Sequence, residues 1–208
     1  MVFKFLANLK KGRGITLVEI VIAIFIMSML SIILISDFPK MQRQFALSRT
    51  AHKLSQDLRK TLDLGLSGLQ IEDSVGNMVS VKGYGIYVDF SSYPTKKYAV
   101  YADVNGDKKY NAGVSYEDNY CKNETSPEAD CVVEIIDVSG ENPSLYIDSV
   151  TNVSETFTSI DFRPPDPLVN IDNISGGFSQ VGIVLGLTSG ETATRTVWVN
   201  TSGLIRVQ

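Results

Sequence analysis

Hydrophobic residues follow two different patterns along this chain of 208 residues, and the change of pattern divides it into two parts. Residues 15–36 are almost continuously apolar, and Glu19 is the only charged residue among them. Beyond Asp37, apolar residues recur at steps of mostly three or four as far as Leu66, which predicts an amphipathic helix. From about residue 78 the period falls to two, which indicates β-strands.

The first pattern predicts one long N-terminal helix from residue 15 to about residue 66. Segment 15–36 has the length of a bilayer-spanning helix, which needs roughly 20 residues, and residues 37–70 form the amphipathic half. We expect Pro39 to bend the helix and Gly65 or Gly68 to end it. The amphipathic half is expected to pack on the rest of the chain through one stripe of residues: Phe38, Met41, Phe45, Leu54, Leu58, Leu62 and Leu66.

The second pattern predicts a β-rich globular head over residues 71–208. Turn-forming residues at 188–191 and 200–203 bracket the penultimate strand, and short strands with tight turns favour antiparallel pairing. The predicted fold class is therefore α+β: a long N-terminal helix, transmembrane in its first half, packed on an antiparallel sheet. Strands are predicted at 78–90, 98–103, 132–138, 144–150, 155–162, 179–187, 192–199 and 204–207.

Charge is distributed unevenly along the chain. Residues 1–14 contain four bases and no acid, whereas the remainder contains 15 bases and 23 acids. The positive-inside rule keeps such a basic end in the cytoplasm and directs the following chain outward. The acidic remainder does not suit general nucleic-acid binding, which depends on neutralising phosphates.

The junction between the basic end and the apolar segment has two unusual residues. The small residue Gly14 precedes the apolar segment, which is longer than a signal-peptide core and is not followed by a small-residue cleavage motif. Glu19 lies about one turn inside the segment, where a carboxylate costs a few kcal/mol and needs a partner. The plain alternative is a simple signal anchor that carries an isolated glutamate.

Residues 10–19, KKGRGITLVE, resemble the type IV prepilin (class III) signal. The resemblance implies that residues 1–14 are a leader and that a prepilin peptidase cuts between Gly14 and Ile15 and methylates Ile15. It also implies that Glu19 pairs with the N-terminal amine of a neighbouring subunit during assembly. Ile15 departs from the Phe or Met that is commoner at the first mature position.

The order of elements in the head is most similar to the minor pilins and pseudopilins of the FimT/GspH group. This resemblance implies a subunit of a pilus or pseudopilus, and not an enzyme. The implied partners are prepilin peptidase, other pilin or pseudopilin subunits and an inner-membrane assembly platform. The implied location is the inner or cytoplasmic membrane, crossed once with the head outside the cytoplasm, and then the fibre.

Two other functions compete with this interpretation. One is a minor pilin at a filament tip that binds DNA or a surface ligand, with Arg195 and Arg206 forming a small basic patch. The other is a membrane-anchored enzyme. The enzyme hypothesis has no supporting Ser/His/Asp arrangement. His52 is the only histidine, and it lies on the predicted helix, where a surface position is expected.

A loop rich in oxygen side chains is the one candidate metal site. Asp103, Asn105 and Asp107 occupy alternate positions, as in the first half of a calcium loop, and calcium stabilises the heads of some pseudopilins. Glu117 and Asp118 are the acids that would close a longer loop. The alternative is a turn rich in Asp and Asn without a metal. No cofactor other than calcium is predicted.

The two cysteines, Cys121 and Cys131, flank a mostly polar run. Outside the cytoplasm oxidation is permitted, which favours a disulfide over two free thiols. The absence of nearby histidines argues against a zinc site, and the spacing differs from the Cys-x-x-Cys of redox catalysts.

Overall fold

The computed structural model describes residues 15–72, 78–111, 130–164, 169–188 and 192–208. The chain divides into two compact units, one that ends at Gln42 and one that begins at Arg43. A single long helix is followed by antiparallel β-sheets, so the predicted α+β fold class is confirmed.

The helix α1 spans Leu17–Ser67, and its assignment continues through Pro39. Gly68 follows its last residue, and the φ of 60° there is the left-handed conformation that commonly terminates helices. Gly65 does not end the helix, contrary to one of the two predicted stops. A Cβ atom at Gly65 would lie 2.5 Å from the carbonyl oxygen of Phe162, so this glycine lets α1 approach a strand closely.

The half of α1 that follows Arg43 packs on the head through one buried face. Leu47, Ala51, Leu54 and Leu58 are almost completely buried there. Phe45 is 64% exposed, so the predicted apolar stripe is wrong at this position. Residues two apart on a helix lie about 200° apart around its axis, which places Phe45 on the side opposite to Leu47.

Leu66 is also exposed, whereas Leu62 packs against the core as expected. Phe38 and Met41, which belong to the first unit, are exposed as well. Within the second unit, the apolar positions of the helix therefore belong to two faces, and the described residues bury the face that carries Leu47, Leu54 and Leu58.

Eleven strands are found in the described residues, all paired antiparallel. They form a five-stranded sheet in the order β5-β4-β3-β7-β8, a four-stranded sheet in the order β11-β10-β9-β6 and the small pair β1-β2. Their bounds are β1 Ile71–Glu72, β2 Met78–Val79, β3 Gly83–Asp89, β4 Lys97–Asp103, β5 Cys131–Asp137, β6 Leu145–Thr151, β7 Phe157–Phe162, β8 Val169–Ile171, β9 Gln180–Leu187, β10 Arg195–Asn200 and β11 Ile205–Val207.

Each predicted strand has a counterpart within a few residues of its expected bounds, with one division. The strand expected over 78–90 is two strands, β2 and β3. The short strands β1 and β8 were not predicted. A short 3-10 helix η1, Val138–Gly140, follows β5 and is capped by the Asp137 side chain.

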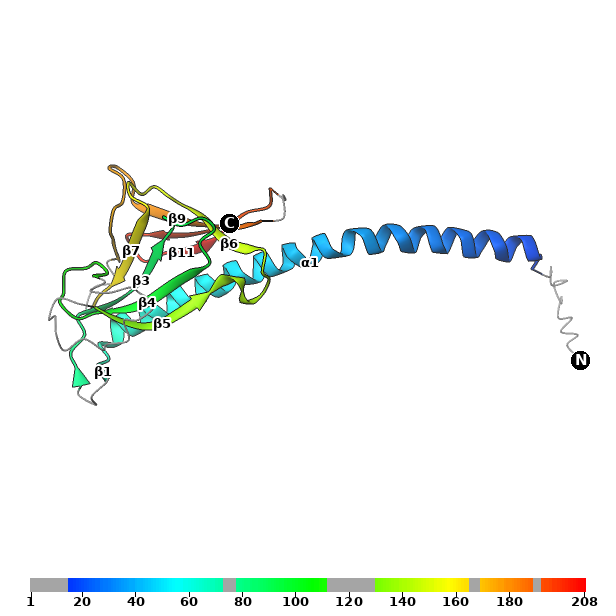
Figure 1. Cartoon of the computed structure of the whole chain (residues 1–208). Coiled ribbons are helices and arrows are strands. Elements are labelled where there is room, and N and C mark those ends of the chain that lie inside the picture. The colour runs from blue at the N-terminus through cyan, green and yellow to red at the C-terminus, as the bar shows by residue number, and fades with distance from the viewer. Residues whose placement is uncertain (1–14, 73–77, 112–129, 165–168, 189–191) are drawn as a thin grey trace, which may run out of the picture. The chain divides into compact units, whose positions relative to one another are not determined.

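The main core lies between the two larger sheets and the buried face of α1. It includes Leu54 and Leu58 from the helix, Ile86 and Ile160 from the five-stranded sheet, and Ile183 from the four-stranded sheet. Figure 1 shows the strands gathered along the second half of α1. Burial of these side chains is worth about 1.5–3 kcal/mol for each residue, so the second half of α1 and the two sheets stabilise one another through a shared core.

Two adjacent helix residues connect α1 to the edge strands of the two sheets. Arg59 donates to the carbonyl oxygen of Ile205 on β11 at 3.4 Å, and Lys60 pairs with Glu134 on β5 at 3.2 Å. Because β11 and β5 each end their sheet, α1 lies between these two edges. The loop that follows β4 covers the face of the five-stranded sheet that points away from α1.

Candidate functional site

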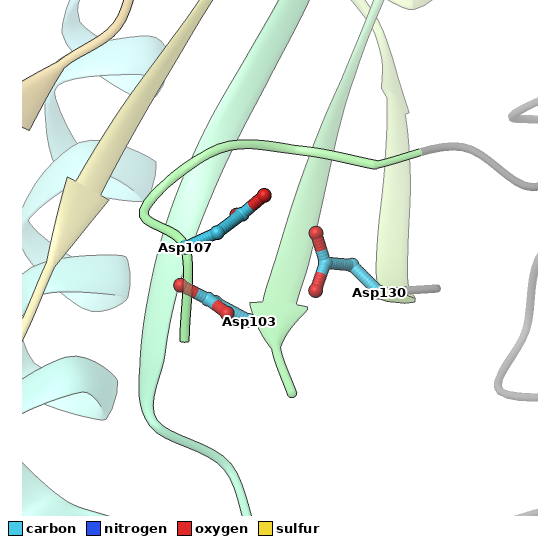
Figure 2. A group of neighbouring side chains, drawn as sticks. All are labelled: Asp103, Asp107 and Asp130. Atoms are coloured by element: carbon cyan, nitrogen blue, oxygen red, sulfur yellow. The ribbon is translucent and has the colours of Figure 1, made fainter. Parts of the chain in front are cut away.

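The loop rich in oxygen side chains, residues 103–111, is called the acidic loop. It begins at the end of β4 and folds over the outer face of the five-stranded sheet (Figure 2). Tyr110 anchors it, because its ring lies 4.6 Å from that of Tyr87 and 5.3 Å from that of Tyr101. The Tyr110 backbone nitrogen donates to the Ser159 hydroxyl at 3.1 Å. The loop therefore covers a second, smaller aromatic cluster on the side of the sheet away from α1.

Asp103 organises the start of the loop from a fully buried position. Its carboxylate accepts hydrogen bonds from the backbone nitrogens of Gly106 at 2.5 Å and Lys108 at 3.0 Å, and from the guanidinium of Arg163. Gly106 and Lys108 both have left-handed backbone conformations, with φ of 87° and 74°. The buried carboxylate therefore holds the loop in a conformation that an L-residue such as Lys108 rarely adopts.

The next two predicted ligands make the same kind of local bond. The Asn105 side chain accepts from the Asp107 backbone nitrogen at 2.8 Å, and the Asp107 side chain accepts from the Lys109 backbone nitrogen at 3.0 Å. Asp and Asn stabilise turns by bonds of this type. Such bonds are those of the turn rich in Asp and Asn, and the turn and the metal loop both stay open as interpretations.

Asp130 is the residue of this site that sequence reasoning missed. It immediately precedes β5 and is almost completely buried, and it accepts from the backbone nitrogens of Val104 at 3.1 Å and Asn111 at 2.8 Å. One carboxylate oxygen from each of Asp103, Asp107 and Asp130 lies within 4.8 Å of the others (Figure 2). The pairing of β5 with β4 brings Asp130 here, and no local motif marks it.

Burial is the main electrostatic influence on Asp130 and raises its pKa to about 7. The two backbone donors oppose this effect, and the charges of Asp103 and Asp107 add to it. A cation among these carboxylates would relieve their mutual repulsion. The three groups are chemically suited to a hard cation such as calcium.

Calcium takes six to eight oxygen ligands, and the three carboxylates supply only part of that number. The predicted ligands Glu117 and Asp118 lie outside the described residues. The calcium site therefore stays a prediction, with Asp130 added to its candidate ligands and Asn105 occupied in a turn.

A second buried carboxylate lies next to the acidic loop. Asp161 on β7 is fully buried, and its Oδ1 atom accepts from Arg163 Nε at 2.8 Å, while Arg163 also reaches Asp103. The other oxygen of Asp161 has no hydrogen-bond partner among the described residues. Burial raises the pKa of Asp161 to about 6, although Arg163 opposes the shift.

The apolar half of α1 has a different character from the head. Every residue from Ile15 to Ile35 is exposed, and the helix is long and apolar enough to cross a membrane. Ser28 and Ser31 donate to carbonyl oxygens of their own helix at 2.8 Å each, which satisfies their hydroxyl protons within this segment. The exposed surface of segment 15–35 is consequently almost entirely apolar.

Glu19 lies in the first turn of α1. Its backbone nitrogen is 3.3 Å from the hydroxyl oxygen of Thr16, which precedes the helix. Thr16 and Glu19 have the spacing of a capping box, in which the acid at the third helical position can also reach back to the cap residue. The Glu19 carboxylate makes no hydrogen bond or ion pair among the described residues.

The predicted cleavage site and the predicted disulfide each include a residue that the structure does not describe. Gly14 and Cys121 lie outside the described residues. Cys131 is disulfide-bonded, and because Cys121 is the only other cysteine, their pairing stays the prediction for this bond.

The strand register separates Arg195 and Arg206, the two residues of the predicted basic patch. Arg206 pairs across the strands with Trp198, and its guanidinium lies 5.8 Å from the Trp198 ring. Arg195 is three residues from Trp198 along β10, so the alternation of side chains along a strand places it on the other face. His52 is exposed, as expected.

Comparisons with protein-family models, with curated proteins and with solved structures find no match to this chain.

Proposed function

We propose that this chain is a type IV pilin-like or pseudopilin subunit, held in a membrane by segment 15–36 and assembled into a pilus or pseudopilus fibre through the same helix. The observation that carries the proposal is the division of α1. Its first half is apolar on all sides and exposed, whereas its second half is part of the core of the head. An apolar helical segment of this length is suited to a membrane.

Glu19 supports assembly over simple anchoring. A carboxylate within an apolar, membrane-spanning segment is costly and usually serves a function. The N-terminal amine of Ile15 from a neighbouring subunit is the partner that the prepilin resemblance supplies. Pairing of the two charges would remove the cost only in the fibre, which would favour the assembled state.

The oxidised state of Cys131 supports a head outside the cytoplasm. Disulfides persist mainly in oxidising compartments, and Cys131 is disulfide-bonded at the start of β5. The basic residues 1–14 favour the same orientation through the positive-inside rule. The disulfide and the basic residues 1–14 are separate observations, and neither depends on the prepilin resemblance.

N-terminal analysis of the membrane-extracted chain tests the proposal. The chain is produced with and without a prepilin peptidase, and its intact mass and N-terminal residue are measured. We expect a mature chain that begins at methylated Ile15 only in the presence of the peptidase. A chain that begins at Met1 in both samples would identify a simple signal anchor.

A variant locates the cleavage site within the same experiment. Gly14→Trp places a bulky residue before the proposed scissile bond, and we expect it to remain full-length with the peptidase present. A shortened product from this variant would show that cleavage occurs at another position.

A further inference from the structure

Three Asn-x-Ser/Thr sequences occur in the described part of the head, at Asn152, Asn173 and Asn200. Such sequences are acceptors for N-linked glycans on surface loops of exported proteins. The motif is short and occurs by chance, so the motif alone does not identify an acceptor. The hydrogen bonds of the three asparagines differ, and they distinguish one of them.

The asparagines at 152 and 173 have structural roles. Both have left-handed backbones, with φ of 65° and 59°, a conformation that asparagine adopts more readily than most residues. Their amide nitrogens donate to backbone carbonyl oxygens, Asn152 to Gln180 at 3.0 Å and Asn173 to Phe157 at 3.3 Å. The amide nitrogen, which would carry a glycan, is therefore in use at both positions.

Asn200 has the opposite arrangement. It ends β10, and its side-chain oxygen accepts from the Ser202 backbone nitrogen at 3.1 Å, the Ser202 hydroxyl at 2.9 Å and the Leu204 backbone nitrogen at 2.7 Å. Its amide nitrogen makes no hydrogen bond among the described residues and is not a buried atom. The side chain is thus held by its oxygen, and its nitrogen is open to solvent.

The turn that carries Asn200 is accessible and well anchored. Ser202 and Leu204 are exposed. The Thr201 backbone is held on both sides, because its nitrogen donates to Ser179 at 2.9 Å and its oxygen accepts from Val169 at 3.1 Å. The asparagine is therefore presented at one fixed position at the end of the β10-β11 hairpin.

The three donors on the Asn200 oxygen also suit the chemistry of amide glycosylation. An amide nitrogen becomes nucleophilic when it loses a proton, and the negative charge then develops mainly on the amide oxygen. Donors already directed at that oxygen stabilise the developing charge. The hydroxyl of Ser202, which the acceptor motif requires, is one of these donors.

We propose that Asn200 is the acceptor of an N-linked glycan. The donor class is a sugar carried on a polyprenyl diphosphate, transferred by a membrane oligosaccharyltransferase. Asn200 Nδ2 forms a bond to the anomeric carbon, the bond from that carbon to the diphosphate oxygen breaks, and the diphosphate leaves with the electron pair. The amide proton passes to a base of the transferase. The inference rests on the proposed function, because it requires the head to lie outside the cytoplasm.

Peptide mass analysis of the full chain, purified from membranes of the cells that make it, tests the inference. Trypsin cleaves after Arg195 and Arg206 and releases residues 196–206, which contain Asn200 as their only asparagine. We expect this peptide to carry the added mass of one or more sugar residues. Peptides that contain Asn152 and Asn173 should be unmodified. Modification at those two positions with Asn200 bare would overturn the assignment.

Two variants separate the motif from the fold. Ser202→Ala keeps Asn200 but removes the hydroxyl, and we expect complete loss of the added mass. Ser202→Thr keeps a hydroxyl and should retain the modification. Thermal unfolding followed by Trp198 fluorescence verifies that both variants are folded. Equal modification of Ser202→Ala and the unaltered chain would overturn the inference.

A second measurement separates this inference from the proposed function. Spheroplasts, in which the outer face of the cytoplasmic membrane is accessible and the membrane itself is intact, are treated with a membrane-impermeant amine reagent, and labelling of head lysines is measured. A labelled head with an unmodified 196–206 peptide overturns the glycan and leaves the proposed function in place. A head that is labelled only after lysis overturns both.

Discussion

Tyr98 on β4 donates a 2.5 Å hydrogen bond to the carboxylate of Asp57 on α1. The tyrosine is 1% exposed, so this bond crosses the core between the helix and the five-stranded sheet. Burial, followed by the bond to Asp57, raises the pKa of Tyr98 far above its ordinary value, and the phenol keeps its proton as a donor. The bond fixes the rotation and the position of α1 relative to β4.

We expect Tyr98→Phe to destabilise the chain by about 1.5–3 kcal/mol, the usual worth of a hydrogen bond to a charged group. The substitution keeps the ring in the core but leaves the Asp57 carboxylate without its phenol donor. Urea unfolding of the chain in detergent, followed by the fluorescence of Trp198, measures the loss. Asp57→Asn combined with Tyr98→Phe should cost less than the sum of the two single changes, and simple additivity would contradict a direct bond.

Gly85 on β3 leaves space for the ring of Tyr101 in the aromatic cluster beneath the acidic loop. A Cβ atom at Gly85 would lie 2.5 Å from ring atoms of Tyr101. We expect Gly85→Ala to cost about 1–3 kcal/mol, because the buried ring or the strand must move. The same unfolding measurement checks this, and Gly140→Ala is the matched control, since a Cβ there meets nothing within 4 Å. Equal stability of the two variants would contradict the packing argument.

The long helix and most strands could be predicted from hydrophobic periodicity, because each has a buried face that repeats over several residues. The strand β8 could not, because Val169–Ile171 has only three residues and follows a proline-rich run. The apolar stripe on α1 was partly wrong for a related reason. Phe45 is as apolar as a core residue, and a sequence does not state which of two apolar faces the chain covers.

The acidic loop was also predictable only in part. Asp103, Asn105 and Asp107 are close in sequence, so their spacing indicated a turn or a metal loop. Asp130 is 27 positions from Asp103 along the chain, and the pairing of β4 with β5 brings the two together. Arg163 likewise reaches Asp103 only because β7 and β4 flank β3. The spacing of residues along the chain therefore indicates the candidate ligands that are close in sequence. It does not indicate the residues that strand pairing brings to the site.

The raised pKa values of buried carboxylates predict an unusual dependence of stability on pH. Folded Asp161 and Asp130 have pKa values of about 6 and about 7, against 3.8 for the ordinary carboxyl. Between about pH 4 and pH 7 the folded state therefore binds more protons than the unfolded state, so stability falls as the pH rises. At about 1.4 kcal/mol for each pKa unit crossed, one by Asp161 and two by Asp130, we expect the free energy of unfolding to be about 4 kcal/mol lower at pH 8 than at pH 5.

Asp161→Asn tests this dependence. The asparagine cannot ionise, so the difference in unfolding free energy between pH 5 and pH 8 should become smaller, whatever the effect on absolute stability. Asp63→Asn, which removes an exposed carboxylate from the second half of α1, controls for the loss of one acid. A difference as large in Asp161→Asn as in the unaltered chain would show that Asp161 contributes nothing to it.

Calcium is expected to stabilise the head through the three neighbouring carboxylates of the acidic loop. Saturating calcium should raise the midpoint of thermal unfolding relative to a sample in chelator, because ligands that bind only the folded state stabilise it. Asp130→Asn should reduce the shift, since it removes one charge from the cluster. Magnesium, which requires a stricter octahedral geometry, is the comparison. Equal midpoints in calcium and chelator would leave the Asp103 loop as a turn without a metal.

The position of Glu19 allows it two roles, capping of α1 and pairing with the N-terminal amine of a neighbouring subunit, and two variants separate them. Glu19→Gln keeps a side chain that can complete the capping box with Thr16 but removes the charge, whereas Glu19→Leu removes both. If Glu19 pairs with the amine of a neighbouring Ile15, both variants should be cleaved normally, and both should be lost from the fibre fraction. A loss of about 1.4 kcal/mol for each subunit contact corresponds to a tenfold weaker association, so we expect a reduction of at least about tenfold.

The ratio of fibre to membrane protein, measured by immunoblot after shearing, reports the result of the Glu19 variants. Asp37→Asn, which removes the next acid along the same helix, is the matched control and should assemble normally. Normal assembly of Glu19→Gln with failure of Glu19→Leu would assign Glu19 to helix capping instead.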